Sequence, residues 1–195
     1  MKLKEKPVAL EGKDGSIVIE RNRYGIPEIT AASMRDSAFA MGWVHANDRQ
    51  LQIMLTRAIL EGRSSEKLSA DPALVEADRY IRSINLYPDI DEQMKRLEPE
   101  VLQSAKSYAG GVNLYLENSP RLMEFRLLGY TPEPWEVKDT MMLAKSFTYF
   151  GLTDVQGNME KLIVQMVQND IGEDKLRELF PYLKEKIDSE LLKKV

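Results

Sequence analysis

The stretch that decides the fold runs from residue 38 to residue 53 and reads Ala38-Phe39-Ala40-Met41-Gly42-Trp43-Val44-His45-Ala46-Asn47-Asp48-Arg49-Gln50-Leu51-Gln52-Ile53. Its apolar residues recur at helical spacing, and the pattern continues to Ile59. Ser33 is a suitable N-cap with Asp36 three residues later, and Gly62 is a suitable terminator. The stretch therefore predicts one long amphipathic helix that ends near Gly62.

The residues before this helix predict a β-hairpin. β-Branched residues dominate residues 16–19, and residues 28–31 resume an extended pattern. Between them, Gly25 permits a positive φ and Pro27 fixes its own φ, a combination typical of a turn.

Helical spacing recurs in several later segments, which prolines and glycines separate. We expect a loop-rich segment from Pro120 to Trp135 and a break from Gly151 to Gly157. Helices are expected at residues 73–84, after or around Pro88, from Pro99 to residue 116, and at residues 139–150, 158–168 and 174–195. The helix at residues 139–150 is apolar enough to be buried. The chain is thus predicted to be α+β, mostly helical with an N-terminal hairpin.

The composition excludes several classes of function. With 195 residues, 43% of them apolar, the chain is long enough to bury one substantial core. The formal net charge of -4 offers no basic excess for nucleic acid, so we expect no nucleic-acid partner. The absence of cysteine excludes disulfides, thiolate metal sites and a cysteine nucleophile.

The sequence indicates no membrane association. No apolar run approaches the roughly 20 residues that span a bilayer. The start, Met1-Lys2-Leu3-Lys4-Glu5-Lys6, lacks the apolar stretch of a signal peptide. The cellular location stays undecided.

The residue types alone do not assemble a catalytic set. His45 is the one histidine, and no Gly-x-Ser-x-Gly turn accompanies it, so we expect a hydrogen-bonded structural role. A metal here would have to be an oxygen-liking ion such as calcium, with Asp154, Asn158 and Glu160 as candidate ligands. Capping of the helix that follows is the alternative role for this cluster. The aromatic residues of 147–150 fit either core packing or a pocket.

Four ordered blocks carry a resemblance to a known family. They are residues 17–29 with the turn Tyr24-Gly25-Ile26-Pro27, residues 38–53 continuing to Arg57 and the run 61–66, residues 108–113, and residues 125–135. Together they resemble the α subunit of the penicillin acylase family of N-terminal-nucleophile hydrolases. Two positions depart from that pattern: Glu28 stands where the family usually has His, and Asn47 where it usually has Gln.

The resemblance implies one half of an enzyme. The fold would be an αββα N-terminal-nucleophile hydrolase completed by a β subunit. Residues 1–195 would form a single domain, in which a hairpin at residues 16–32 joins the partner's sheet and residues 33–195 are mainly helical. Family members cut themselves from one precursor, and a serine at the start of the β subunit acts as nucleophile with its own α-amino group as base. No catalytic residue is then expected in this chain.

The same resemblance implies a reaction and a binding region. The substrate would be a linear or side-chain N-acyl amide of the penicillin or acyl-homoserine lactone type, hydrolysed to a carboxylic acid and an amine without an organic cofactor. A structural Ca²⁺ would take Asn158, or Glu160 in a register shifted by two, near Asp154. A non-catalytic helical binding or scaffold domain is the alternative function. The acyl pocket would be lined from this chain by Phe147, Thr148, Phe150, Gly151 and Leu152.

Overall fold

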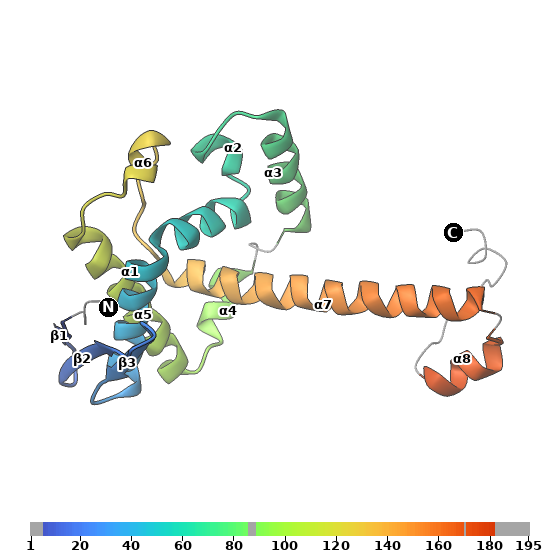
Figure 1. Cartoon of the computed structure of the whole chain (residues 1–195), viewed down its shortest axis with the longest axis horizontal. Helices are drawn as coiled ribbons and strands as arrows, with labels where there is room; N and C mark the ends of the chain where they lie inside the picture. Colours follow the sequence, from blue (N-terminus) through green and yellow to red (C-terminus); the bar gives the residue numbers. More distant parts are fainter. Residues whose placement is uncertain (1–5, 86–88, 170, 182–195) are drawn as a thin grey trace. The chain divides into compact units, whose positions relative to one another are not determined.

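The computed structural model of the chain describes residues 6–85, 89–169 and 171–181 (Figure 1). It contains a small antiparallel sheet at the N-terminus, and helices make up most of the rest. The α+β class is therefore confirmed. Two compact units can be separated, Met1–Ser146 and Phe147–Val195, and each is described by itself. A single domain over residues 1–195 stays a prediction.

The sheet has three strands in the order β1-β2-β3, which are β1 (Val8–Glu11), β2 (Ser16–Arg21) and β3 (Pro27–Thr30). β2 pairs with β3 in antiparallel register, so the predicted hairpin is confirmed. Its turn uses Gly25 at φ +78°. The side chain of Asn22 accepts hydrogen bonds from the N–H groups of Tyr24 and Ile26. The sequence did not predict β1, and the pairing of this sheet with a partner's sheet stays a prediction.

Helix α1 (Met34–Leu60) begins and ends as the sequence predicts. The hydroxyl of Ser33 accepts a hydrogen bond from the Asp36 N–H at 3.1 Å, and Gly62 after the helix has a φ of +61°. The buried Asp36 carboxylate accepts from the N–H groups of Lys13 and Asp14 at 2.8 and 2.9 Å. One side chain thus joins the helix start to the turn between β1 and β2.

The other helices are α2 (Ser64–Lys67), α3 (Pro72–Ile84), α4 (Ile90–Lys95), α5 (Pro99–Asn118), α6 (Met123–Leu127), α7 (Val137–Gln168) and α8 (Glu173–Leu179). The helices predicted at 73–84 and from Pro99 are confirmed, and α6 lies inside the expected loop segment. Of the helix predicted at 174–195, the structure describes only the part that contains α8, and residues 182–195 lie outside the described residues. No helix in the described part of the chain combines the length and hydrophobicity needed to cross a membrane.

Helices α1 and α5 cross at very close range. A Cβ atom on Gly42 would overlap the carbonyl of Tyr108, and one on Gly111 would overlap the carbonyl of Phe39. Around this crossing lies the larger core, to which α1, α5, α6 and the segment before α7 contribute buried side chains: Ala46, Met54, Ala109, Val112, Phe125, Tyr130 and Trp135. A second cluster of Ile17, Ile19, Ala40 and Val44 lies between the sheet and α1. These two clusters fix the first unit.

The expected break at Gly151–Gly157 is wrong, because α7 is continuous through both glycines. Neither glycine has a positive φ, and a Cβ atom on either would meet nothing within 4 Å. A helical glycine costs only about 1 kcal/mol relative to alanine, which a long helix can absorb. Burial of residues 139–150 is also only partly correct: Met142 is fully buried, but Phe147 is 75% exposed.

Candidate functional site

The residues predicted to line an acyl pocket lie on consecutive turns of α7. The side chains of Phe147, Phe150 and Leu152 are 75%, 45% and 65% exposed, and Thr148 and Gly151 are also exposed. Tyr149 and Phe150 pack edge to face with ring centroids 5.4 Å apart. Their role as a wall of an acyl pocket stays a prediction.

The exposed apolar side chains continue along the same helix. Leu152, Val155, Met159 and Leu162 follow one another at intervals of three, four and three residues and are between 40% and 65% exposed. Such spacing places them on one helical face. This apolar stripe of α7, defined by those four residues, is the kind of surface that a partner covers.

The candidate calcium ligands do not form a calcium site by themselves. Asp154 and Asn158 lie one turn apart, and the Asn158 amide donates to the Asp154 carboxylate at 3.2 Å. Glu160 instead accepts from Gln156 at 2.8 Å. Calcium requires six to eight oxygen ligands, and no group of three or more acidic or histidine side chains gathers for a metal in the described part of the chain. Capping, the alternative role for this cluster, is also wrong, since α7 runs through Asn158 and no helix begins there.

The start of α7 is held by an asparagine from α5. The Asn113 side chain accepts a hydrogen bond from the Trp135 N–H at 2.7 Å and donates to the Trp135 carbonyl at 2.9 Å. The indole N–H of Trp135 donates to the hydroxyl of Thr140 at 3.0 Å. Because Trp135 is 2% exposed, this pairing fixes both the backbone and the ring just before α7.

A buried ion pair completes this support. Arg57 of α1 contacts Asp139 of α7 at 3.2 Å, and the two side chains are 3% and 2% exposed. The guanidinium also donates to the carbonyls of Pro134 and Glu133 at 2.9 and 3.0 Å. Burial raises the pKa of Asp139 above the ordinary aspartate value, and the Glu136 N–H and the Arg57 charge only partly oppose this effect. The network positions the loop before α7 and the first turn of the helix.

His45 makes the structural contact that the sequence predicts. Its Nδ1 lies 2.9 Å from the hydroxyl of Tyr108 on α5. Burial lowers the pKa of His45 below its usual value, and the Asp48 carboxylate partly opposes the shift. Burial also raises the pKa of Tyr108. The contact joins α1 to α5. It accounts for His45 without a role as a catalytic base.

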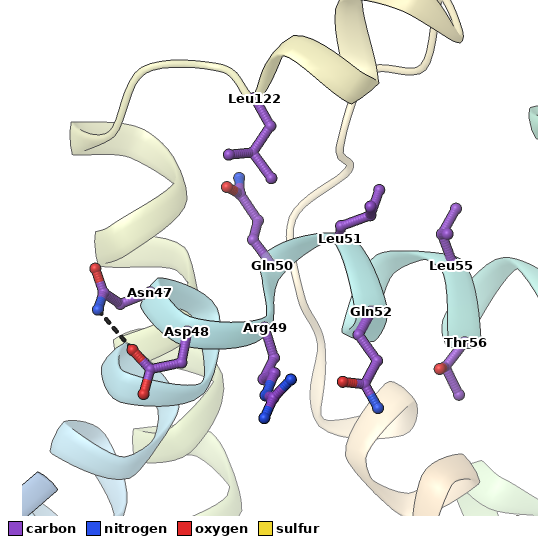
Figure 2. A pocket seen from close by; sticks show the side chains of 9 residues that line it. All are labelled: Asn47, Asp48, Arg49, Gln50, Leu51, Gln52, Leu55, Thr56 and Leu122. Carbon is purple, nitrogen blue, oxygen red and sulfur yellow. Dashed lines mark hydrogen bonds between the residues drawn. The ribbon is translucent and has the colours of Figure 1, made fainter. Parts of the chain in front are cut away.

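Helix α1 is kinked at Arg49, within the motif stretch of residues 38–53. The backbone of Arg49 is non-helical, with φ -138° and ψ 25°, and the helix resumes at the next residue. A surface pocket of about 530 Å³ surrounds the kink, lined by Asn47, Asp48, Arg49, Gln50, Leu51, Gln52, Leu55, Thr56 and Leu122. Figure 2 shows Gln50, Leu51 and Leu55 on the side of Leu122, whereas Arg49, Gln52 and Thr56 point to the other side. The Leu122 side of the pocket is therefore apolar except for the buried Gln50 amide, and the other side is polar.

Sequence reasoning missed both the ion pair and the kink. Arg57 and Asp139 are 82 residues apart, and only the packing of α1 against the segment before α7 brings them together. Arg57 and Asn113 did fall inside the motif blocks, which was the available signal. No sequence signal indicated the kink, because neither proline nor glycine, the usual causes of a kink, stands at residues 47–51.

The chain is similar to proteins of one family. The family model described as penicillin amidase matches residues 16–189. The acyl-homoserine lactone acylase QuiP of Pseudomonas fluorescens is 32% identical over 174 residues, which cover 88% of this chain and 21% of that protein. The penicillin acylase 2 proenzyme of a Pseudomonas species is 35% identical over 130 residues, which cover 66% of this chain and 16% of that protein. The chain thus spans about a fifth of the length of these curated relatives.

A solved structure shares the fold. A chain of the thermostable penicillin G acylase from Alcaligenes faecalis superposes with a TM-score of 0.63 at 24% identity. The match covers 88% of this chain and 93% of that chain.

Proposed function

Because this chain belongs to the penicillin amidase family, we propose that it is the α subunit of a self-processed acylase. The complete enzyme hydrolyses an N-acyl amide of the penicillin or acyl-homoserine lactone type to a carboxylic acid and an amine. It is an amidohydrolase acting on carbon–nitrogen bonds other than peptide bonds. The nucleophilic serine lies on a β subunit derived from the same precursor.

The observation that carries this proposal is the family match over residues 16–189. Two observations support the subunit role, one from a related structure and one from this chain. The solved acylase contains a separate chain that this one matches over 93% of its length. The apolar stripe of α7 is exposed in this chain and is suited to burial against a partner.

In the proposed reaction, the serine hydroxyl attacks the amide carbonyl while the α-amino group of the same residue accepts its proton. The amine leaves, and water then hydrolyses the acyl-enzyme to the free acid. This chain contributes binding and position. Residues 147–152 form one wall of the acyl pocket, and the Arg57–Asp139 pair with Asn113 holds the start of the helix that carries them.

We propose calcium binding only for the enzyme assembled from both subunits. Asp154 and Asn158 supply at most a few of the oxygen ligands that calcium needs, so the partner would have to supply the rest. No step of the reaction depends on it.

The test is expression of the complete gene product beside residues 1–195 alone, each assayed against a panel of acyl amides. We expect self-cleavage and amidase activity only from the complete product, and loss of both when the serine that begins the partner chain is replaced by alanine. A complete product that folds, stays uncleaved and hydrolyses no acyl amide would favour the scaffold alternative.

A further inference from the structure

The polar side of the pocket at the α1 kink contains an arginine without a partner. Arg49 is exposed, and it makes no hydrogen bond or ion pair with any residue in the part of the chain that the structure describes. Gln52 is also exposed and points to the same side as Arg49, followed one turn later by Thr56 (Figure 2). A cation beside an amide and a hydroxyl can bind a carboxylate and the polar groups next to it.

The neighbouring acid, Asp48, pairs with other side chains and not with Arg49 in the described part of the chain. Both oxygens of Asp48 accept from the Arg21 guanidinium, at 3.0 and 2.5 Å, and the Asn47 amide donates to one of them at 2.8 Å. The bidentate pairing keeps Asp48 with the β2 strand. The charge of Arg49 is thus left for a group from outside.

The fold gives Arg49 no task within the first unit. The core faces of α1 are supplied by apolar residues such as Val44, Ala46 and Met54, all of which are buried. Yet Asp48, Arg49 and Gln52 match the motif stretch by which the sequence resembles its family. An exposed arginine with no partner in the described part of its own chain is suited to bind a charged group from another chain.

We propose that Arg49 anchors the partner subunit by binding an acidic side chain of that chain, with Gln52 hydrogen-bonding beside it. This rests on the proposed function, since it requires a β subunit. The chain spans about a fifth of its relatives' length, so a large remainder of such a protein is there to provide the acid.

The test uses both subunits of the gene product, produced together with a tag on the α subunit. Arg49→Glu is compared with Arg79→Glu, a matched charge reversal on α3 at a side chain that is 75% exposed with one weak contact to Glu76 at 3.8 Å. We expect Arg49→Glu to reduce the partner retained on the tag at least about tenfold, because a like charge replaces an attraction at a contact surface. Arg79→Glu should retain as much partner as the wild type.

A second variant distinguishes a loss of binding from a folding defect. Arg49→Gln keeps a polar side chain on the exposed helix face, and it should weaken retention less than Arg49→Glu while removing the part of the salt dependence that Arg49 contributes. Equal retention and equal salt dependence of all variants would overturn the proposal. Unchanged assembly with a raised KM would also overturn it, since Arg49 would then bind substrate. If wild-type subunits assemble but lack acylase activity, the proposed function fails while the anchor can still be measured; if they do not assemble, both fail.

Discussion

At the scale of single residues, the most demanding contact is the buried pair of Arg57 and Asp139. Replacing Arg57 with Met should lower the free energy of unfolding by about 3–5 kcal/mol, because the Asp139 charge and two backbone carbonyls lose their donor. Arg57→Lys should cost less. The measurement is urea unfolding of the assembled protein.

The partner change provides the control for this prediction. Adding Asp139→Leu to Arg57→Met removes the unpaired carboxylate and should recover part of the lost stability. A loss in Arg57→Met no larger than that of an exposed substitution such as Arg79→Ala would contradict the role assigned to the pair.

His45 gives a prediction about pH. Its pKa is lowered by burial, so the folded protein binds a proton less tightly than the unfolded chain does. The stability it contributes is complete above the ordinary histidine pKa of about 6.5 and decreases as the pH falls below that value toward the lowered pKa. In His45→Gln this part of the pH dependence should disappear, and turnover per folded enzyme should stay within a few fold, because a base would contribute about 10²–10⁴-fold. Urea midpoints above and below pH 6.5, with a turnover assay, check both statements.

Single residues differ in how well the sequence predicted them. Ser33 was predicted as a cap because capping is a local relation over three residues. Arg57 was seen only as a motif residue, because its partner lies 82 residues away and the desolvated site exists only after the helices pack. Local chemistry is readable from sequence, whereas a buried network depends on tertiary structure.

At the scale of elements, the crossing of α1 and α5 is the most restrictive. Gly111→Ala should destabilise the protein by about 1–3 kcal/mol or more, because the added carbon would overlap the Phe39 carbonyl and the helices would have to separate. Gly157→Ala on α7 is the matched control. Nothing lies within 4 Å of its added carbon, and it should stabilise the helix by up to about 1 kcal/mol. Thermal unfolding of both variants should give shifts of opposite sign, and a shared sign would contradict one of the two accounts.

Helix α7 also carries the prediction about substrate choice. If residues 147–152 wall the acyl pocket, Gly151→Phe should reduce kcat/KM more for longer acyl groups, since each excluded methylene is worth about 0.8 kcal/mol. The position has room for a larger side chain within this chain, because nothing lies within 4 Å of an added Cβ. Kinetics over a series of acyl lengths make the measurement. Wild-type ranking at full activity would show that this stretch does not line the pocket.

Elements with strong end signals were predicted with their limits, whereas α7 was predicted as two helices, 139–150 and 158–168, with a break between them. The hairpin and the limits of α1 follow from local turn and cap residues. The two glycines of α7 are ambiguous in sequence, because a glycine can mark a break or can lie in an exposed helix at a cost of about 1 kcal/mol. Placement of Phe147, Thr148, Phe150, Gly151 and Leu152 on a pocket wall therefore stays a prediction.

At the scale of the whole molecule, the apolar stripe of α7 predicts dependence on a partner. Residues 1–195 alone should show no amidase activity and should self-associate or bind a hydrophobic dye, because Leu152, Val155, Met159 and Leu162 stay exposed. Size-exclusion chromatography and an acyl-amide assay test this. A monomeric isolated chain with activity comparable to the complete enzyme would contradict the subunit role.

The glycine pair at the α1–α5 crossing also limits how this chain can diverge. Any replacement of Gly42 or Gly111 adds at least one carbon, and that carbon would meet a backbone carbonyl rather than a side chain that can rotate away. Moving the helices apart would open the core around Ala46 and Val112. Each such replacement should lower stability, so we expect the crossing to change less among related chains than the exposed positions of both helices that bind nothing. The two glycines are therefore useful reference positions when the sequences of distant relatives are aligned.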